Sequence, residues 1–263
     1  MIRLSPLPFG ILALAATSPA LAGEVACRYE AGTITVPAVV AGIGGDYILD
    51  TGAAQTTLHS TKAEAEGITD TALTGDVRVA GMAVRAAVLT VADLDVRTWN
   101  LPTPAAGVIG ADVLRGFVVD VSYAPCRVRL WPAGQAPRFT GRVLNLGWDL
   151  GRPTAEASVS DEMRTIRGRF VIASGANAPV RLADDLARVV PGTLPRSQEV
   201  YPDGVWLARL PQVSFAGATG LDAGAGLMKP EGDVVGLLGA DVLAHFRLRF
   251  DFPAGKLIAQ PLP

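Results

Sequence analysis

The stretch Y47-I-L-D-T-G-A-A-Q-T-T-L-H-S60 joins an apolar segment to a tight turn. Tyr47–Leu49 is typical of a short β-strand, and Asp50, Thr51 and Gly52 follow it directly. Glycine tolerates the sharp backbone turn that lets a carboxylate project from the end of a rigid strand. The threonine hydroxyl can donate a hydrogen bond inward and brace the turn. The stretch therefore predicts a carboxylate held firmly at a cleft.

The second half of the chain repeats this frame with one change. The segment VIASG ends at Gly175 and places Ser174 and Gly175 where the first half has its hydroxyl and its glycine. Ala173 stands at the position of the acid and cannot act as one. The turn is therefore predicted to be intact as a scaffold but to lack its carboxylate.

Another pair of matching segments supports a duplication. GVIGADVLRGF begins at Gly107 and GLLGADVLAHF begins at Gly236, each followed by an alternating strand pattern. Two markers that recur in the same order at nearly the same spacing indicate a tandem repeat. Asp112 and Asp241, within these segments, are predicted to start short helical turns.

Both halves are typical of an all-β protein with few short helices, because short alternating strands are separated by turn signals. The segment 132–142 is rich in Pro and Gly and is the natural linker. We therefore expect a first lobe over 23–131, which carries Asp-Thr-Gly, and a second lobe over 143–263, which carries Ala-Ser-Gly.

Local signals predict several smaller elements. A hairpin should turn at Gly81, and a glycine-rich turn should span 42–46. A short helix with a capping-box pattern is expected at 61–66, and a matching helical turn at 181–188. A second hairpin is expected to turn at Pro202-Asp203-Gly204.

Residues 1–22 have the features of a signal peptide. Arg3 precedes a short apolar run at 9–16, and Ala20-Leu21-Ala22 forms a small-x-small cleavage site. The apolar run is shorter than the roughly 20 residues of a membrane-spanning helix. A retained anchor is the alternative. We expect cleavage after Ala22, a periplasmic or secreted protein and no stable membrane insertion.

Export would make Cys27 and Cys126 candidates for a disulfide, with two buried free thiols as the alternative. No metal site or cofactor is expected, since the two histidines, His59 and His245, show no ligand spacing. The formal net charge is only −2, so no basic field is expected to hold nucleic acid. The glycines of GIGGDY do not match a dinucleotide fingerprint, because the third glycine is missing and a strand follows.

Taken together, these motifs resemble the aspartic proteases, specifically the retropepsin-like and pepsin-like families. The resemblance rests on ILDTGA at 48–53, on VIG at 108–110 and LLG at 237–239, and on their duplicated order. It implies two β-barrel lobes related by a pseudo-two-fold axis. It also implies that each apolar-apolar-Gly element lies behind a catalytic turn, and that a hairpin flap covers the substrate.

The same resemblance assigns roles to the turn residues. Asp50 matches the catalytic acid, while Thr51, Gly52, Ser174 and Gly175 match the turn-supporting positions. In such enzymes two carboxylates share one proton: the ionised one takes a proton from water, and the protonated one polarises the peptide carbonyl. Ala173 is the degenerate dyad position.

Four interpretations of the missing acid stay open. A homodimer through first lobes would supply a second Asp50, or another carboxylate such as Asp203 would reach the cleft. The protein would otherwise be a pseudoprotease that binds extended peptides without cutting them. Asp50 could also be only a turn-forming residue. We expect an exported aspartic-type endopeptidase-like protein that hydrolyses extended peptide or protein substrates through Asp50 and an activated water.

Overall fold

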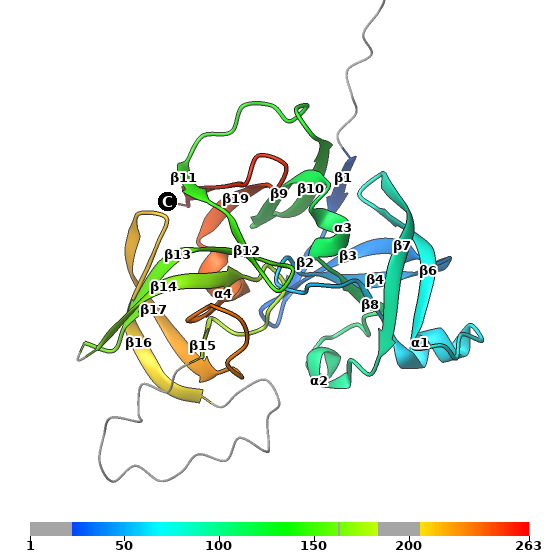
Figure 1. Ribbon diagram of the computed structural model, residues 1–263, viewed down its shortest axis with the longest axis horizontal. Coiled ribbons are helices and arrows are strands. Elements are labelled where there is room, and N and C mark those ends of the chain that lie inside the picture. Colours follow the sequence, from blue (N-terminus) through cyan, green and yellow to red (C-terminus); the bar gives the residue numbers. More distant parts are fainter. Residues whose placement is uncertain (1–22, 163, 184–205, 263) are drawn as a thin grey trace, which may run out of the picture.

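The computed structural model describes residues 23–162, 164–183 and 206–262, and for 206–208 the backbone alone. Figure 1 shows two β-barrels side by side, with a third sheet running across the top between them. The predicted all-β, two-lobed fold is confirmed. Within the described ranges, no helix has the length and apolar character needed to cross a membrane.

The first barrel closes on itself through six strands in the order β3-β4-β8-β5-β7-β6, with β3 pairing β6 and with β2 beside β3. Its elements are β2 (Arg28–Glu30), β3 (Thr33–Val40), β4 (Ile43–Leu49), β5 (Thr57–His59), α1 (Ser60–Ala65), β6 (Ala72–Val79), β7 (Met82–Ala92), α2 (Asp95–Thr98), β8 (Gly107–Ile109) and α3 (Ala111–Leu114).

The second barrel repeats this topology in the order β13-β14-β18-β15-β17-β16, with β13 pairing β16 and with β12 beside β13. The matching strand orders show the duplication that the motifs predicted. Its elements are β12 (Gly147–Asp149), β13 (Arg152–Ser160), β14 (Thr165–Ile172), β15 (Val180–Leu182), β16 (Trp206–Phe215), β17 (Ala218–Leu227), β18 (Gly236–Leu238) and α4 (Ala240–Leu243).

A six-stranded central sheet joins the lobes in the order β1-β10-β9-β19-β20-β11. One hairpin of the sheet comes from each half of the chain, and β9 pairs antiparallel with β19, with Val121 opposite Leu248. The two lobes are thus connected by backbone hydrogen bonds. The strands are β1 (Gly23–Ala26), β9 (Phe117–Tyr123), β10 (Cys126–Pro132), β11 (Arg142–Asn145), β19 (Phe246–Asp251) and β20 (Lys256–Pro261).

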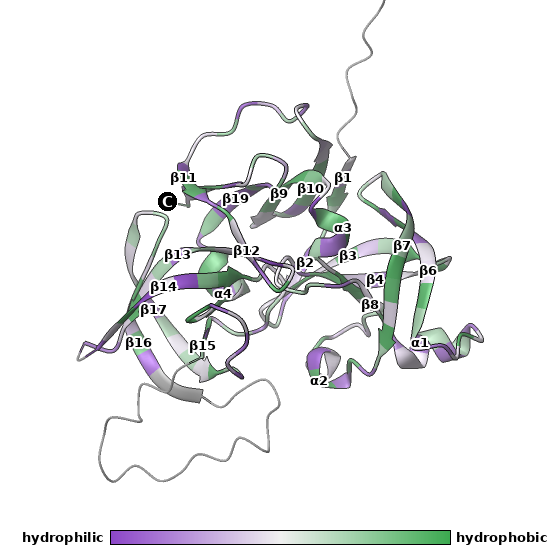
Figure 2. Cartoon of the chain, in the orientation of Figure 1, coloured by the Kyte–Doolittle hydropathy of each residue, from purple (hydrophilic) through white to green (hydrophobic). Residues whose placement is uncertain are grey.

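The strand before Asp50 is apolar because it is buried on both faces. Tyr47–Leu49 pairs in parallel with Gly107–Ile109, and all six residues are buried. Parallel strands covered on both sides carry continuous apolar runs. Gly107 is required by close packing, since a Cβ there would lie 2.3 Å from the carbonyl oxygen of Thr57. Figure 2 shows the hydrophobic colour along much of β8, β7 and α4.

The predicted disulfide forms between Cys27 and Cys126, which are 99 residues apart. Cys27 lies between β1 and β2, and its N–H donates to the carbonyl of Cys126 at 3.2 Å. The bridge therefore attaches the start of the first barrel to the central sheet.

Several local predictions of the first lobe need correction. The hairpin at Gly81 is confirmed, with β6 and β7 meeting at Ala80–Gly81. The glycine-rich turn is limited to Ala41–Gly42, because Ile43–Asp46 already belongs to β4 and pairs with β3. The short helix α1 exists, but its N-cap is His59 and no side chain caps it, so the predicted capping box is wrong.

The two predicted helical turns form at Ala111–Leu114 in the first lobe and at Ala240–Leu243 in the second. Arg181 and Leu182, expected in a helical turn, belong to strand β15, while the rest of 181–188 from Asp184 onward lies outside the described residues. The predicted hairpin turn at 202–204 also lies outside the described residues. The hairpin β16–β17 of this lobe turns at Ala216–Gly217.

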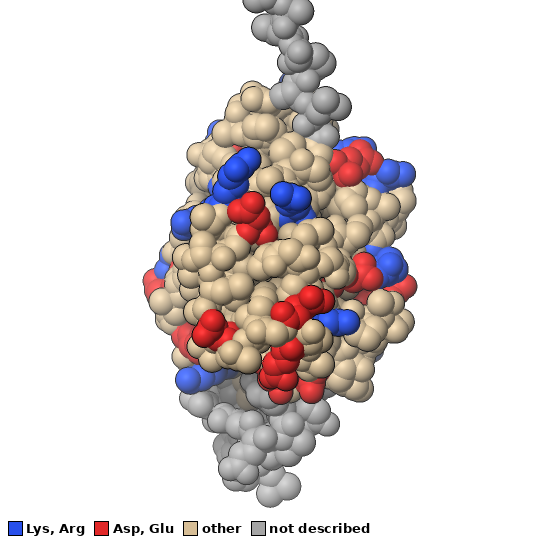
Figure 3. All heavy atoms as spheres, turned by 90° about the vertical axis from the view of Figure 1, so that its right-hand side faces the viewer, with Lys and Arg blue, Asp and Glu red and all other residues tan. Residues whose placement is uncertain are grey.

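The surface carries charges of both signs in small mixed groups on the face that Figure 3 presents. This face is mostly uncharged, and no continuous basic area covers it. The picture fits the formal net charge of −2.

Candidate active site

Asp50 lies at the end of β4, where the backbone turns toward the second lobe. Its N–H donates to the carbonyl of Ile109 on β8 at 3.0 Å, which fixes the turn on the strand behind it. The residue is only 3% exposed. Carboxylate Oδ1 accepts hydrogen bonds from the N–H of Gly52 at 2.8 Å and of Gly175 at 3.2 Å. The carboxylate is therefore held by backbone donors from both lobes.

The two turns are tied together by four buried hydrogen bonds. The hydroxyl of Thr51 donates to the carbonyl of Ile172 at 2.6 Å, and that of Ser174 donates to the carbonyl of Leu49 at 3.0 Å. Each hydroxyl also accepts from the other residue's N–H, at 3.0 and 3.1 Å. The two hydroxyl residues thus satisfy each other's backbone across the lobe interface.

Asp50 and Ala173 occupy equivalent places opposite the partner turn. A Cβ on Gly52 would lie 2.4 Å from the Cβ of Ala173, and a Cβ on Gly175 would lie 2.8 Å from the Cβ of Asp50. Both glycines are therefore needed because the facing turn comes too close for any side chain. Ala173 is fully buried, so the second half supplies a methyl group where the first half supplies a carboxylate.

Arg97 supplies a cation that the sequence did not reveal. Its Nη2 lies 2.7 Å from Asp50 Oδ2, so the guanidinium pairs with the outer oxygen of the carboxylate. The Asp50 side chain is 5% exposed and that of Arg97 is 30% exposed. Arg97 belongs to α2, 47 residues from Asp50 and outside any recognisable motif, so no sequence signal connected the two.

Helix α2 is attached to the barrel beside the turn. His59 at the end of β5 is buried, and its Nε2 lies 3.1 Å from Asp95 Oδ1 at the start of α2. Asp93 Oδ1 in turn accepts from the N–H of Asp95 at 2.8 Å. Within the described part of the chain, His59, Asp93 and Asp95 form one set whose metal-ligating atoms lie within 4.8 Å of one another. The sequence suggested that His59 is isolated, but the fold places it beside these two carboxylates.

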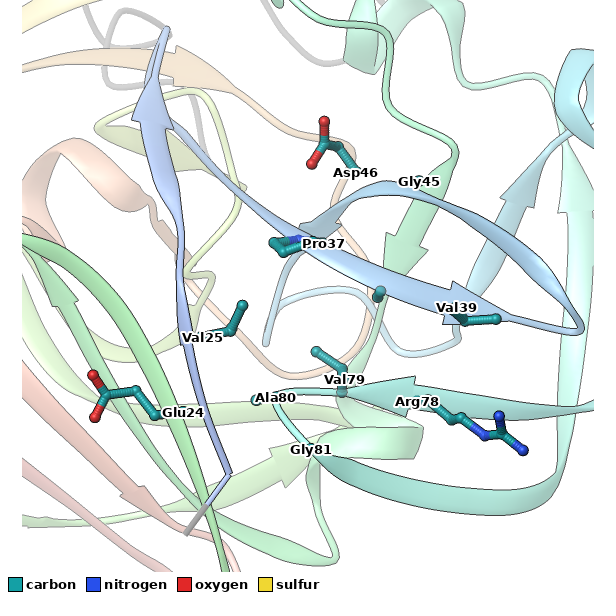
Figure 4. Close-up of a pocket in the computed structure, with 11 residues that line it drawn as sticks. Glu24, Val25, Pro37, Val39, Gly45, Asp46, Arg78, Val79, Ala80 and Gly81 are labelled. Atoms are coloured by element: carbon teal, nitrogen blue, oxygen red, sulfur yellow. The ribbon is translucent and has the colours of Figure 1, made fainter.

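The resemblance implied a flap between Asp-Thr-Gly and VIG, and the hairpin β6–β7, which lies there in the chain, has its tip at the start of β1. The tip of β6–β7 packs against the start of β1, where a Cβ added to Gly81 would lie 3.5 Å from the Cα of Gly23. Figure 4 shows this tip beside Glu24 and Val25, where it borders a surface groove of about 580 Å³. Among the described segments, the side chain that contacts Asp50 Oδ2 comes from α2 instead.

Two tyrosines support the turns from the central sheet. Tyr123 donates to the carbonyl of Ser174 at 3.3 Å, and burial raises its pKa well above the usual value of 10.0. Tyr29 packs edge-on against Tyr123 and donates to Asp241 Oδ1 at 2.6 Å. Burial and then this bond raise the pKa of Tyr29. In the first lobe, Asp112 instead accepts from the N–H and hydroxyl of Thr56.

Residues 36–119 match the family model described as "Aspartyl protease". A solved structure of an aspartic proteinase from Irpex lacteus is similar with a TM-score of 0.53, over 92% of this chain and 97% of that one. The first lobe is therefore similar to the aspartyl protease family, and the two-lobed fold is similar to that of an aspartic proteinase. Sequence identity to the Irpex lacteus protein is 11%, so that likeness concerns the fold. No curated protein matches the chain.

In this aspartic-protease-like chain, the fold brings together all the turn residues singled out from the sequence: Asp50, Thr51, Gly52, Ala173, Ser174 and Gly175. The catalytic role of Asp50 stays a prediction. Asp203, considered as a replacement acid, lies outside the described residues.

Proposed function

We propose that this aspartic-protease-like protein binds extended peptides between its lobes, and that its resting form does not hydrolyse them as a two-acid enzyme does. The observation that carries this proposal is the ion pair between Arg97 and Asp50, in a site whose second acid position is Ala173. Strand pairing and side-chain pockets are the usual means of binding an extended peptide.

The chemistry of the dyad explains why the pair matters. Hydrolysis needs one carboxylate to take a proton from water and a protonated partner to donate to the scissile carbonyl. Asp50 Oδ1 already accepts two backbone hydrogen bonds, and Oδ2 faces the Arg97 guanidinium. Ala173 has no proton to donate. Loss of a positioned acid typically lowers the rate by about 10²–10⁴, and groups acting as a unit lose nearly all activity together.

The alternative is hydrolysis through Asp50 and an activated water, and the intact turn frame favours it. Every inter-lobe hydrogen bond of Thr51 and Ser174 is present, so a carboxylate is the one part that is missing. In this alternative, a bound peptide separates Arg97 from Asp50. The guanidinium then stabilises the negative charge that develops on the carbonyl oxygen.

A homodimer through the first lobes fits less well. Thr51 already makes its cross-turn hydrogen bonds with Ser174 of the same chain. A second first lobe would have to displace that turn, at the cost of four buried hydrogen bonds. We therefore propose that the site is formed within one chain.

We also propose that the protein is exported. The support is the apolar N-terminal segment with its small-x-small site, and the Cys27–Cys126 disulfide, a bond that persists in oxidising compartments. Mass spectrometry of the protein recovered from the periplasm or medium should show Gly23 as the first residue. An uncleaved chain retained in the cytosol would contradict export.

Four proteins test the proposed function: the parent, Ala173→Asp, Arg97→Gln and the double variant. We expect the parent to bind an unstructured fluorescent peptide library without cutting it at acid or neutral pH. Ala173→Asp should gain pepstatin-sensitive cleavage, and the double variant should gain more because Asp50 is then unpaired. Adding Asp50→Asn should abolish every gain.

The matched control is Arg115→Gln, which removes an exposed arginine away from the turn and should change nothing. Cleavage by the parent as a monomer, lost in Asp50→Asn, would favour the alternative. Cleavage undiminished in Asp50→Asn would contradict both.

A further inference from the structure

The central sheet has two faces with different chemistry. Side chains alternate along a strand, so Tyr123 reaches the carbonyl of Ser174 on the inner face, while Ser122 lies on the outer one. The outer face borders a groove of about 470 Å³, within the range of small-molecule sites. Five arginines line it, from β10, β19 and the segment between β10 and β11: Arg127, Arg129, Arg138, Arg247 and Arg249.

One row across this face is neutralised by alternating charges. The strand register places Glu24, Arg129, Asp120 and Arg249 side by side on four neighbouring strands. Arg249, which is buried, donates to both carboxylate oxygens of Asp120, at 2.6 and 2.7 Å, and lies over the ring of Phe139. This row provides a rigid floor rather than free charge.

The groove as a whole carries an excess of positive charge. Arg127 and Arg129 share a single carboxylate, Glu24, and their hydrogen bonds lower its pKa. Arg138 and Arg247 are exposed and make no ion pair within the described ranges. Five guanidinium groups therefore face two carboxylates, in a chain whose net charge is negative. Such a concentration of arginine favours an anion.

The geometry also selects the kind of anion. Arg127 on β10 and Arg247 on β19 flank β9, so their Cα atoms are about 10 Å apart, two strand spacings. The small Ser122 lies between them and leaves room for a group that both guanidiniums can reach. Planar guanidinium forks bind phosphate oxygens in pairs. Trp131 and Phe139 add aromatic walls for an attached organic part.

We propose that this outer groove binds a small soluble phosphate monoester, with Arg127 and Arg247 holding the phosphate over Ser122. The site lies on the opposite face of the central sheet from Asp50 and does not depend on the proposed function.

Isothermal titration of the full chain with inorganic phosphate and with glycerol 3-phosphate tests the proposal. We expect both to bind, with the ester tighter. Arg127→Gln and Arg247→Gln should each weaken binding about tenfold or more, because each removes charge-assisted hydrogen bonds. Arg115→Gln removes the same charge outside the groove and should leave binding unchanged.

Three results would overturn it. One is the absence of phosphate binding to the parent, and another is equal binding by a double Arg127→Gln/Arg247→Gln variant that keeps the parent's circular dichroism. The third is binding to phosphatidylglycerol vesicles, but not phosphatidylcholine vesicles, without binding of the soluble ester. That outcome would assign the arginines to a membrane surface instead.

Discussion

The two lobes share one backbone design but differ in their ionisable side chains. Asp50 and Ala173 both receive support from the strand behind them, with N–H donors 3.0 and 2.9 Å from the carbonyls of Ile109 and Leu238. The aromatic pair Tyr29–Tyr123 of the first half has the counterpart Trp148–Phe252 in the second.

Strand position extends the comparison to the core of each barrel. Tyr47 lies opposite Gly107 in the first barrel, and Phe170 lies opposite Gly236 in the second. At each of the three aromatic places the second lobe keeps a ring and lacks the phenol hydroxyl of the first lobe. The packing of these rings therefore does not depend on an ionisable group.

The largest expected difference in stability between the lobes comes from the disulfide, which only the first lobe has among the described residues. Replacing Cys27 and Cys126 together by Ala should lower the free energy of unfolding by about 2–5 kcal/mol, since the bridge closes a long loop. Denaturant titration with and without reductant measures it. The parent should be sensitive to reductant and the double variant insensitive. Equal stability of the two proteins would contradict the prediction.

The reciprocal hydrogen bonds predict equal costs on the two sides of the interface. Ser174→Ala and Thr51→Val should each destabilise the protein by about 2–4 kcal/mol, because each leaves two buried backbone groups without partners. The double variant should cost about the sum, since the four backbone groups that lose their partners are all different. A marked asymmetry between the two single variants would break the equivalence of the lobes.

Alkaline pH should separate the lobes, because the tyrosines described here all lie in the first half. Their pKa values are raised, that of Tyr47 to about 12, so the folded state holds these protons more tightly than the unfolded chain. Stability is therefore fully present below about pH 10 and falls as pH rises further.

While the buried Tyr123 stays protonated in the folded protein and ionises in the unfolded chain, it lowers the free energy of unfolding by about 1.4 kcal/mol per pH unit. Tyr123→Phe should reduce the dependence of the unfolding free energy on pH by that amount between about pH 10 and 12. Phe252→Tyr places a hydroxyl at the matching position of the second lobe and serves as the reverse experiment. A slope unchanged by Tyr123→Phe would contradict the assignment.

The smallest effect is expected at the hydrogen bond between Tyr29 and Asp241, which links the first half to the second. Tyr29→Phe should cost about 1–1.5 kcal/mol, because the bond is partly exposed and the ring contact with Tyr123 remains. The measurement is thermal unfolding of Tyr29→Phe and of Trp148→Phe, which changes the matching ring of the second lobe. A larger loss of stability in Trp148→Phe than in Tyr29→Phe would contradict the importance given to the Tyr29 hydroxyl.

Much of the fold could be predicted because it follows from local rules repeated twice. The apolar strand, the acid and the glycine at 47–52 needed only strand and turn preferences, and Cys27 and Cys126 were the only available pair. Arg97 could not be found in this way. Its partner is 47 residues distant, and only the closure of the barrel brings α2 to Asp50. The capping box failed because His59, held in β5, sets the start of α1 instead.

The shared central sheet has a consequence for how the chain is made. Strands β19 and β20 occupy the sheet between β9 and β11, yet they come from the last residues of the chain, up to Pro261. During synthesis the first barrel emerges complete while β9 still has one open edge, and an unpaired edge invites pairing with other chains. A chain that stops near residue 245 would keep the strands of both barrels but lack β19 and β20, which leaves the edge of β9 unpaired and prone to aggregation. That edge is covered only when β19 has been made and pairs with β9.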